Sequence, residues 1–443
     1  MAGMVGADIA ELQALADAFT TSAELVERIS VQLTPRIMSS GWHGPDVERF
    51  RHDWNHVHRG TLSATVHSLQ EVAGILRLNA RQQEQASAAG TAGRVAFAAV
   101  AGASPVVACI ENPTPTQANE WWDSLTPEQR EYQITRNPAY VGNLDGLPAA
   151  VRDRANRIEL DRELARTPCE PGDSKYAQLM AIKKSLETTG NAWDRQRQLL
   201  VFKPDKQPPG VAIGFGDVDT ADHVSVFTPG MNTKVVDLPH NVSDTVSLKL
   251  RAENMMWQQY EDGQTVATVY WLDYHSPQWA QAAVGTDALE GGQTLASFAD
   301  GIDASRPDGV HLTALGHSYG SVVTGVALRG TSAFDDAVVF GSPGLGTDDA
   351  HDLNVPDGHL YVMESGVKGW PGRGLFGGWD AVADSGYYGP DPSGMDGAVQ
   401  LSTAQTTHGG ESSGHSEYLK VQTTAQYNAA AVISGNSQLV VRK

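Results

Sequence analysis

The sequence contains only two cysteines, Cys109 and Cys169, among 443 residues. Two thiols can form at most one bridge, so a disulfide framework does not hold this chain together. Positive charge is also scarce, because 32 lysine and arginine residues stand against 52 aspartate and glutamate residues, for a formal net charge of −20. A field of this sign repels phosphate groups, so the composition argues against nucleic acid or anionic lipid as partners and favours small neutral substrates.

Long apolar segments are absent as well. The N-terminus carries Asp8 and Glu11 where a secretory signal peptide has a positive segment followed by an apolar one. The most apolar stretch, 95–110, is shorter than the roughly 20 residues that span a membrane and is interrupted by Gly102 and Pro105. We therefore expect no classical signal peptide and no stable transmembrane segment, which leaves the location open between the cytoplasm and export by another route.

Two helical periodicities open the chain. Apolar residues recur at helical spacing through residues 5–39 and again through 47–76. The segment SSGWHGPD between them contains glycines that interrupt a helix and a proline, Pro45, that suits a first helical turn. This pattern predicts an all-α antiparallel hairpin within residues 1–90.

The hairpin contains the segment WHGPDVERFRHDW, with Trp42, Gly44, Phe50 and Trp54. It resembles the WXG-type family of helical hairpins, which are substrates of type VII secretion systems and often pair with another hairpin. The resemblance implies a helical-hairpin protein partner or self-association through residues 1–90, and export by the type VII route. A tryptophan that only fills a helix corner is the alternative interpretation.

The middle of the chain connects this hairpin to a different kind of domain. Residues 91–118 are rich in Ala, Gly, Ser, Thr and Pro, which predicts a linker. Helical patterns follow over 119–198, where Thr126 before Pro127 is a helix start signal. We expect this helical segment to pack on the domain that follows it.

From residue 199 onward, short apolar runs alternate with helical or polar stretches. Most of these runs are apolar on both faces, as in parallel strands covered by helices. The expected strands are 199–204, 211–216, 223–230, 265–274, 310–317, 336–344, 359–365 and 398–403. Residues 199–443 are therefore predicted to form an open, mostly parallel α/β sheet.

One serine stands out in this region. The stretch TALGHSYGSV places Ser318 between Gly316 and Gly320, after the strand 310–317 and before an apolar helical stretch. That layout is typical of a nucleophile elbow, in which a strained turn lifts a hydroxyl above the sheet edge. GESSG, centred on Ser412, has the same spacing but lacks the strand and the helix. Ser318 is therefore the predicted nucleophile, and a purely structural turn is the alternative.

A serine nucleophile needs a carboxylate and a histidine base, which follow it in the chain in this architecture. Asp380 and Asp384 are the candidate acids, with Glu364 third because it lies within a strand run. The residues themselves do not separate the two aspartates. His408 and His415 are the candidate bases, and His415 is favoured because a helical stretch directly follows it.

The loop TPGMN after the third strand is predicted to complete an oxyanion hole. Gly230 keeps its backbone open, Met231 would present one amide, and Tyr319 at the start of the helix would present the other. An ordinary Pro-Gly turn is the alternative. No cofactor and no metal are expected, because the sequence has no P-loop, paired-cysteine zinc pattern or dinucleotide fingerprint. The aspartate-rich segment GDVDTADH lacks the glycine and terminal glutamate of a calcium loop.

Eight ordered blocks carry a wider resemblance: WWDSLTPEQ, PAAVRDRANRIEL, GFGDVDTADHVSVFTPGMNT, YWLDYHSP, GHSYGS, GSPG, YYGPDP and HSEYL. Together they resemble a bacterial α/β-hydrolase family of unknown function, over about residues 121–420. The resemblance implies an α/β-hydrolase fold, favours Asp380 as the acid through the segment DAVADSGYYGPDP, and maps the base onto His415. The insert before Asp380 departs from the short loop of the family, so Asp384 stays open.

These features predict a serine hydrolase that cleaves a carboxylic ester, from a small molecule or a lipid, through a Ser-His-Asp triad and an acyl-enzyme. An ester is preferred to an amide because an alkoxide leaves with less help from a proton. Two alternatives stay open. The protein could be a type VII secretion-related effector or partner-binding protein in which the hairpin is primary, or a hydrolase-like binding module without catalysis.

Overall fold

The computed structural model describes residues 9–39, 107–169, 174–191, 196–259, 263–277, 286–365 and 388–443, together with Asp194 and separate positions between 41 and 77. The chain divides into two compact units, Met1–Ala103 and Ser104–Lys443. Both candidate acids, Asp380 and Asp384, and most of the predicted linker lie outside the described residues. No helix of the described part is both long enough and apolar enough to cross a membrane.

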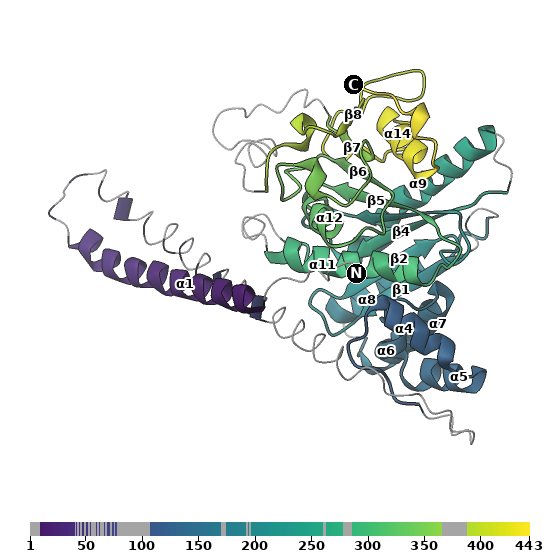
Figure 1. The fold of residues 1–443 in the computed structure, drawn as a ribbon, viewed down its shortest axis with the longest axis horizontal. Helices are drawn as coiled ribbons and strands as arrows, with labels where there is room; N and C mark the ends of the chain where they lie inside the picture. The colour runs from purple at the N-terminus through teal and green to yellow at the C-terminus, as the bar shows by residue number, and fades with distance from the viewer. Residues whose placement is uncertain are drawn as a thin grey trace, which may run out of the picture. The chain divides into compact units, whose positions relative to one another are not determined.

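The first unit contains the long helix α1, Ile9–Met38 (Figure 1). Two contacts join α1 to the segment that follows it. Trp54 Nε1 donates to Thr34 Oγ1 at 3.1 Å, and Arg77 Nη2 pairs with Asp17 Oδ1 at 2.8 Å. Trp54 comes before Arg77 in the chain, whereas its partner Thr34 comes after Asp17. The two segments therefore run antiparallel, as the sequence predicts for a hairpin.

An eight-stranded sheet forms the centre of the second unit (Figure 1). Its strands are β1 Arg197–Lys203, β2 Gly210–Phe215, β3 His223–Thr228, β4 Val266–Leu272, β5 His311–His317, β6 Asp336–Phe340, β7 Leu360–Met363 and β8 Val399–Leu401. The spatial order is β1-β2-β4-β3-β5-β6-β7-β8. The pairs β1–β2 and β2–β4 are antiparallel and the others are parallel. The predicted mostly parallel α/β sheet is confirmed, and each predicted strand is present.

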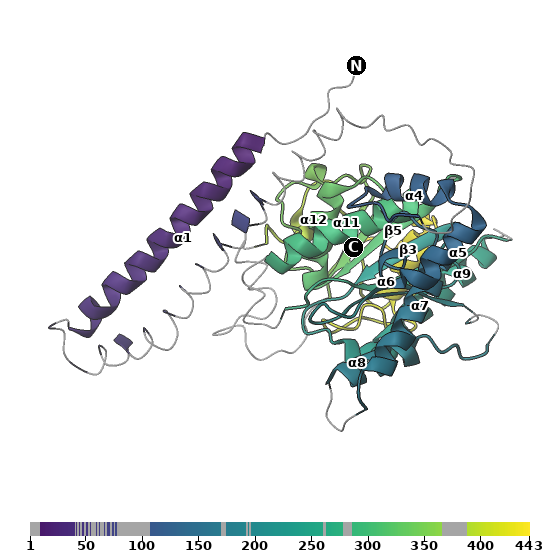
Figure 2. The same ribbon diagram turned by 90° about the horizontal axis from the view of Figure 1, so that it is seen from below.

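Helices cover both faces of the sheet. The α-helices described in this unit are α4 Pro115–Ser124, α5 Pro127–Arg136, α6 Pro138–Val141, α7 Ala149–Arg166, α8 Ser174–Ser185, α9 Leu238–Gln258, α11 Thr286–Ala304, α12 Tyr319–Gly330 and α14 Thr424–Ile433, of which α4, α5 and α6 pack on other helices around a second apolar cluster. In β4, Thr268 Oγ1 donates to the carbonyl of Thr245 in α9, whereas the Trp271 ring lies 6.5 Å from that of Phe298 in α11. Alternate strand residues face opposite sides, so α9 and α11 cover opposite faces. Figures 1 and 2 show α11 and α12 side by side.

The helices before the sheet begin at strong capping signals. Thr114 and Gln117 form a capping box at α4, and Thr126 and Gln129 form another at α5. The second start was predicted from the sequence. The first lies within residues 91–118, which we predicted as a linker, and α4 begins there because a capping threonine is followed by a proline suited to the first helical position.

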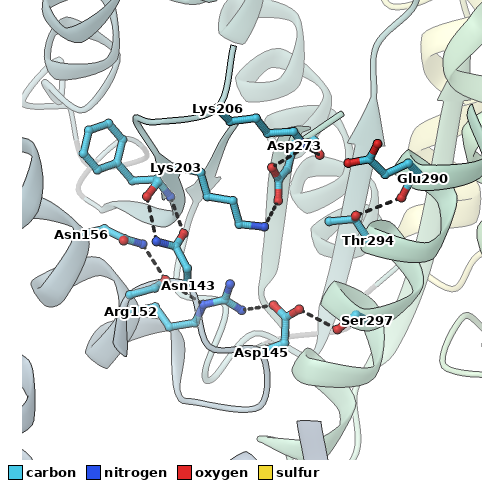
Figure 3. Close-up of polar contacts among 12 residues, drawn as sticks. Asn143, Asp145, Arg152, Asn156, Lys203, Lys206, Asp273, Glu290, Thr294 and Ser297 are labelled. Atoms are coloured by element: carbon cyan, nitrogen blue, oxygen red, sulfur yellow. Dashed lines mark hydrogen bonds and ion pairs between the residues drawn. The ribbon is translucent and has the colours of Figure 1, made fainter. Parts of the chain in front are cut away.

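Polar side chains fasten this helical segment to the sheet and to α11 (Figure 3). The side chain of Asn143 donates to the carbonyl of Phe202 at 2.7 Å and accepts its N–H at 2.8 Å. Arg152, which is buried, pairs with Asp145 at 3.0 Å, and Ser297 of α11 donates to the same carboxylate at 2.7 Å. Removing one partner of such a pair would leave an uncompensated charge and destabilise the fold. The contacts of Asn143 and Asp145 thus hold the helical segment to β1 and α11.

The aspartates of GDVDTADH bind backbone groups. Asp219 accepts the N–H groups of Ala149 and Ala150 at 2.6 and 2.8 Å, which caps the start of α7. Asp222 accepts the N–H of Thr265 at 2.8 Å. Both carboxylates therefore stabilise backbone that lies far from them in the sequence.

Candidate functional site

Ser318 lies between the last residue of β5 and the first residue of α12. Its backbone has φ of 54° and ψ of −128°. A positive φ is rare outside glycine and costs on the order of 1–3 kcal/mol, so the surrounding structure must hold it. The Ser318 N–H donates to the carbonyl of Phe340 at 3.0 Å, and Ser321 Oγ donates to the carbonyl of Ser318 at 2.5 Å. These bonds fix the sharp turn that the sequence predicts.

The two glycines of the pattern give the turn its room. A Cβ atom on Gly316 would lie 2.7 Å from Cα of Ser321, and one on Gly320 would lie 2.2 Å from the carbonyl oxygen of Thr228. Both contacts are with backbone atoms that cannot move aside. Glycine is therefore required at both positions, for the reason given by the sequence pattern.

The loop after β3 lies against the serine. A Cβ atom on Gly230 would lie 2.8 Å from Cβ of Ser318. The carbonyl of Gly230 accepts hydrogen bonds from Ser276 Oγ at 3.0 Å and from Thr233 Oγ1 at 2.6 Å. Since this carbonyl and the N–H of Met231 belong to one peptide group, the two hydroxyls also fix the direction of that N–H.

Tyr319, the other predicted oxyanion donor, is the first residue of α12. Its N–H belongs to the first helical turn, where donors have no acceptor within the helix. Its ring is buried and stacks on that of Tyr274 with centroids 6.3 Å apart. The two predicted donors thus come from the two segments that enclose Ser318, the helix that follows it and the loop that touches it.

A cavity of about 480 Å³ adjoins these segments, and Ser318, Met231 and His415 are among its lining residues. Ser318 is only 2% exposed, and its hydroxyl has no hydrogen-bond partner within the described residues. His408 is exposed, stacks on Tyr427 with ring centroids 4.2 Å apart, and is not among the lining residues. Of the two candidate bases, the structure brings His415 to the cavity that contains Ser318.

His317 connects the serine turn to His415, a contact that the sequence analysis missed. His317 Nε2 lies 2.7 Å from the carbonyl oxygen of His415, and the two rings lie 5.0 Å apart. The carbonyl can only accept, so Nε2 is the donor. Burial lowers the pKa of both histidines to about 4, and for His317 the neighbouring His415 adds to the effect. Both imidazoles are therefore neutral above about pH 5, and a neutral imidazole is the form that accepts a proton.

The carboxylate partner remains a prediction. Asp380 and Asp384 lie outside the described residues. Glu364 directly follows β7, its backbone carbonyl accepts a hydrogen bond from Thr403 Oγ1 at 3.0 Å, and it is not among the residues that line the cavity. The described residues thus give no support to the third candidate.

The cavity also contains polar side chains that sequence reasoning did not single out. Asn241 and Asp244 of α9 line it together with Tyr270 of β4. Burial raises the pKa of Asp244, although His240 and Lys420 oppose the shift. The spacing of Asn241 and Asp244, three residues apart early in a helix after the predicted oxyanion loop, is the signal that could have indicated them.

Comparison with known proteins adds an independent finding. The sequence profile of a family described as "Alpha/beta hydrolase" matches residues 205–369. The uncharacterised protein Rv0963c of Mycobacterium tuberculosis is 33% identical over 241 residues, which cover 52% of this chain and 83% of the relative. The uncharacterised protein Mb0988c of Mycobacterium bovis matches with the same identity and the same coverage.

A third relative is longer. The uncharacterised protein Rv2079 of Mycobacterium tuberculosis is 30% identical over 284 residues, which cover 56% of this chain. The matched region makes up 42% of that relative, so the chain spans less than half of its length.

Proposed function

Because this chain belongs to the α/β-hydrolase family, we propose that it is a serine hydrolase that cleaves a carboxylic ester through an acyl-enzyme intermediate. One observation carries the proposal. The hydroxyl of Ser318 is held on a strained turn without a hydrogen-bond partner in the described chain, in the cavity that His415 also lines. A buried hydroxyl without a partner and a positive φ both cost free energy, and such costs persist at functional sites.

In the proposed reaction, Ser318 Oγ attacks the ester carbonyl carbon and His415 takes the hydroxyl proton. The carbonyl oxygen becomes an oxyanion, which the N–H groups of Met231 and Tyr319 bind. When the carbon–oxygen bond to the alcohol breaks, His415 returns its proton to the leaving alkoxide. A water molecule then attacks the acyl-serine with His415 again as the base, which releases the acid and restores the serine.

The proposed acid is Asp380, with Asp384 as the alternative. Its role is to accept the N–H of the histidine and to stabilise the imidazolium that forms during the reaction. The support for Asp380 is the similarity of DAVADSGYYGPDP to the pattern of the family, and the insert before it keeps Asp384 open.

A fluorophosphonate probe tests the proposal, because it reacts covalently with an activated serine. We expect one adduct per chain, on Ser318, located by mass spectrometry of the digested protein. The adduct should disappear in Ser318→Ala and persist in Ser412→Ala. Ser412 is a demanding control because it has the same glycine spacing and is also a buried serine whose hydroxyl has no partner in the described chain. A folded wild-type protein that stays unlabelled would favour a binding module without catalysis.

A second proposal concerns the N-terminal hairpin, which we infer pairs with a second copy of itself, as a type VII-related hairpin would. Leu25, Ile29 and Leu33 follow one another at i, i+4 spacing along α1 and are 50%, 43% and 37% exposed. An exposed apolar row on an amphipathic helix is suited to packing against another helix. This proposal does not exclude catalysis by the second unit.

Sedimentation of the full chain tests this pairing. We expect Ile29→Glu to weaken self-association by at least about tenfold, since each copy would lose about 1.5–3 kcal/mol of apolar burial. Glu27→Gln, an exposed change two residues away, is the matched control. A wild-type chain that sediments as a monomer at micromolar concentration would rule out self-association through this row.

A further inference from the structure

Helix α9 gives the cavity beside Ser318 a polar side. Asn241 and Asp244, three positions apart and therefore on one face of the helix, both line the cavity. Thr233, from the loop between β3 and α9, and Ser416, from the loop between β8 and α14, line it as well. A pocket for a purely hydrocarbon acyl or alkyl chain would not place an amide, a carboxylate and hydroxyl groups around the substrate, so these groups indicate a substrate with polar atoms of its own.

Asp244 supplies the strongest acceptor of this set. No hydrogen bond or ion pair of its carboxylate occurs among the described residues, and burial raises its pKa. A carboxylate that is partly removed from water without a donor costs free energy, which a ligand offering N–H or O–H groups would recover. The cavity thus contains an acceptor whose donor is expected on the ligand.

Charged groups near Asp244 bear on whether that donor is a cation or a hydroxyl group. His240 and Lys420 lie near enough to Asp244 to oppose the rise of its pKa. Lys420 also pairs with Glu417 Oε1 at 2.5 Å, which holds its ammonium group in this region. The charge of Lys420 is therefore already balanced by Glu417, so the choice of donor rests on the neutral amide and hydroxyl groups that line the same cavity, and the choline ester below tests a cation instead.

The other polar groups suit hydroxyl groups too. Burial raises the pKa of Tyr270 above its ordinary value, although the side chain of Asn241 opposes the shift, so the phenol keeps its proton and can donate. The amide of Asn241 can donate and accept. An acceptor, an amide and a phenol around one space match adjacent hydroxyl groups, each of which both donates and accepts.

We propose that this cavity binds the polyhydroxylated alcohol of a neutral ester, of the kind that glycerol or a sugar provides, with Asp244 accepting hydrogen bonds from its hydroxyl groups. The inference rests on the proposed ester hydrolysis and names its substrate class. A volume of about 480 Å³ lies within the range of roughly 300–1,000 Å³ typical of small-molecule sites. Asp244 acts here in specificity and takes no part in bond cleavage.

Four butyrate esters that share one acyl group provide the test. The alcohols are propanol, glycerol, glucose and choline. The propyl ester has no free hydroxyl group, the glyceryl and glucose esters keep several, and the choline ester is cationic. We expect wild-type kcat/KM to be about 10- to 100-fold higher for the glyceryl or glucose ester than for the propyl ester, because hydrogen bonds to a charged group discriminate by that much. The glycerol and glucose arms distinguish a lipid-like from a carbohydrate alcohol.

Replacing the carboxylate identifies its share of that preference. In Asp244→Leu, which is similar in size and adds no buried polar group, the ratio of kcat/KM for the polyol ester over the propyl ester should fall by about tenfold or more. Asp308→Asn changes an exposed carboxylate that does not line the cavity and should leave the ratio unchanged.

The outcomes distinguish failure of the polyol site from failure of the proposed ester hydrolysis on which it rests. A probe-labelled Ser318 with a preference for the propyl ester, or a polyol preference that survives Asp244→Leu, overturns the polyol site alone. A preference for the choline ester overturns it in favour of a cation site. A folded protein that neither reacts with the fluorophosphonate nor hydrolyses any of the four esters overturns ester hydrolysis, and the polyol site with it.

Discussion

Replacing Ser318 with alanine is expected to lower kcat for ester hydrolysis by about 10⁶-fold, since removal of the nucleophile of a serine triad costs about that much in a well-studied protease. The residual rate would come from substrate binding and the oxyanion donors alone. Steady-state hydrolysis of an activated ester such as p-nitrophenyl butyrate measures the change, and Ser412→Ala should retain wild-type kcat. A Ser318→Ala protein that keeps more than about a tenth of the wild-type kcat would contradict the assignment.

The stability of the same variant separates a functional serine from a structural one. The Ser318 hydroxyl has no partner within the described residues, so its removal breaks no hydrogen bond there. We therefore expect the free energy of unfolding of Ser318→Ala to equal or exceed that of the wild type, by up to about 1 kcal/mol. Loss of activity without loss of stability would show that the strained turn is retained for chemistry.

The sheet could be predicted from the sequence because its evidence is local. Val224, Val226 and their neighbours in β3 form a run that is apolar on both faces, and the other central strands show the same pattern. The start of α5 was local as well, since Thr126 and Pro127 stand together. The partner that caps α7 was not local, because the carboxylate that accepts its first free N–H groups belongs to Asp219, 70 residues later.

The candidate site shows the same difference between features with local evidence in the sequence and features that depend on distant contacts. The turn at Ser318 could be predicted because strand, glycines and helix are contiguous in the chain. The choice between His408 and His415 could only be weighed, because it depends on how one loop folds back on the sheet edge. His317 was missed although it precedes the serine, because its role is a contact with a carbonyl 98 residues away. Asp244 was missed because the sequence does not fix which face of α9 meets the cavity.

His415→Gln is expected to lower kcat by about 10⁴- to 10⁶-fold, because without a base the serine hydroxyl keeps its proton during attack. Glutamine preserves the volume and a polar end but cannot take up a proton at neutral pH. His408→Gln, at an exposed position outside the cavity lining, should leave kcat unchanged. The reverse result, with His408→Gln inactive and His415→Gln active, would move the base to the other histidine and separate it from the cavity of Ser318.

The pH dependence of kcat/KM tests the same residue in the wild type. Burial lowers the pKa of His415 to about 4, so the base stays neutral, and active, until the pH falls through about 4. An ordinary imidazole of pKa about 6.5 would be roughly nine-tenths protonated at pH 5.5 and would lose most activity there. We therefore expect kcat/KM at pH 5.5 to stay close to its value at pH 7.5.

His317 shares that titration, since its pKa is lowered to about 4 as well and its ring lies 5.0 Å from that of His415. Two interacting groups titrate as a pair, so the acid limb belongs to both. In His317→Asn, which keeps a side-chain donor, the limb should become less steep and stay near pH 4, because burial is the cause of the shift at His415. The carboxylate of the proposed acid opposes burial, so a limb near pH 6.5 in the wild type would mean that this carboxylate outweighs burial at His415.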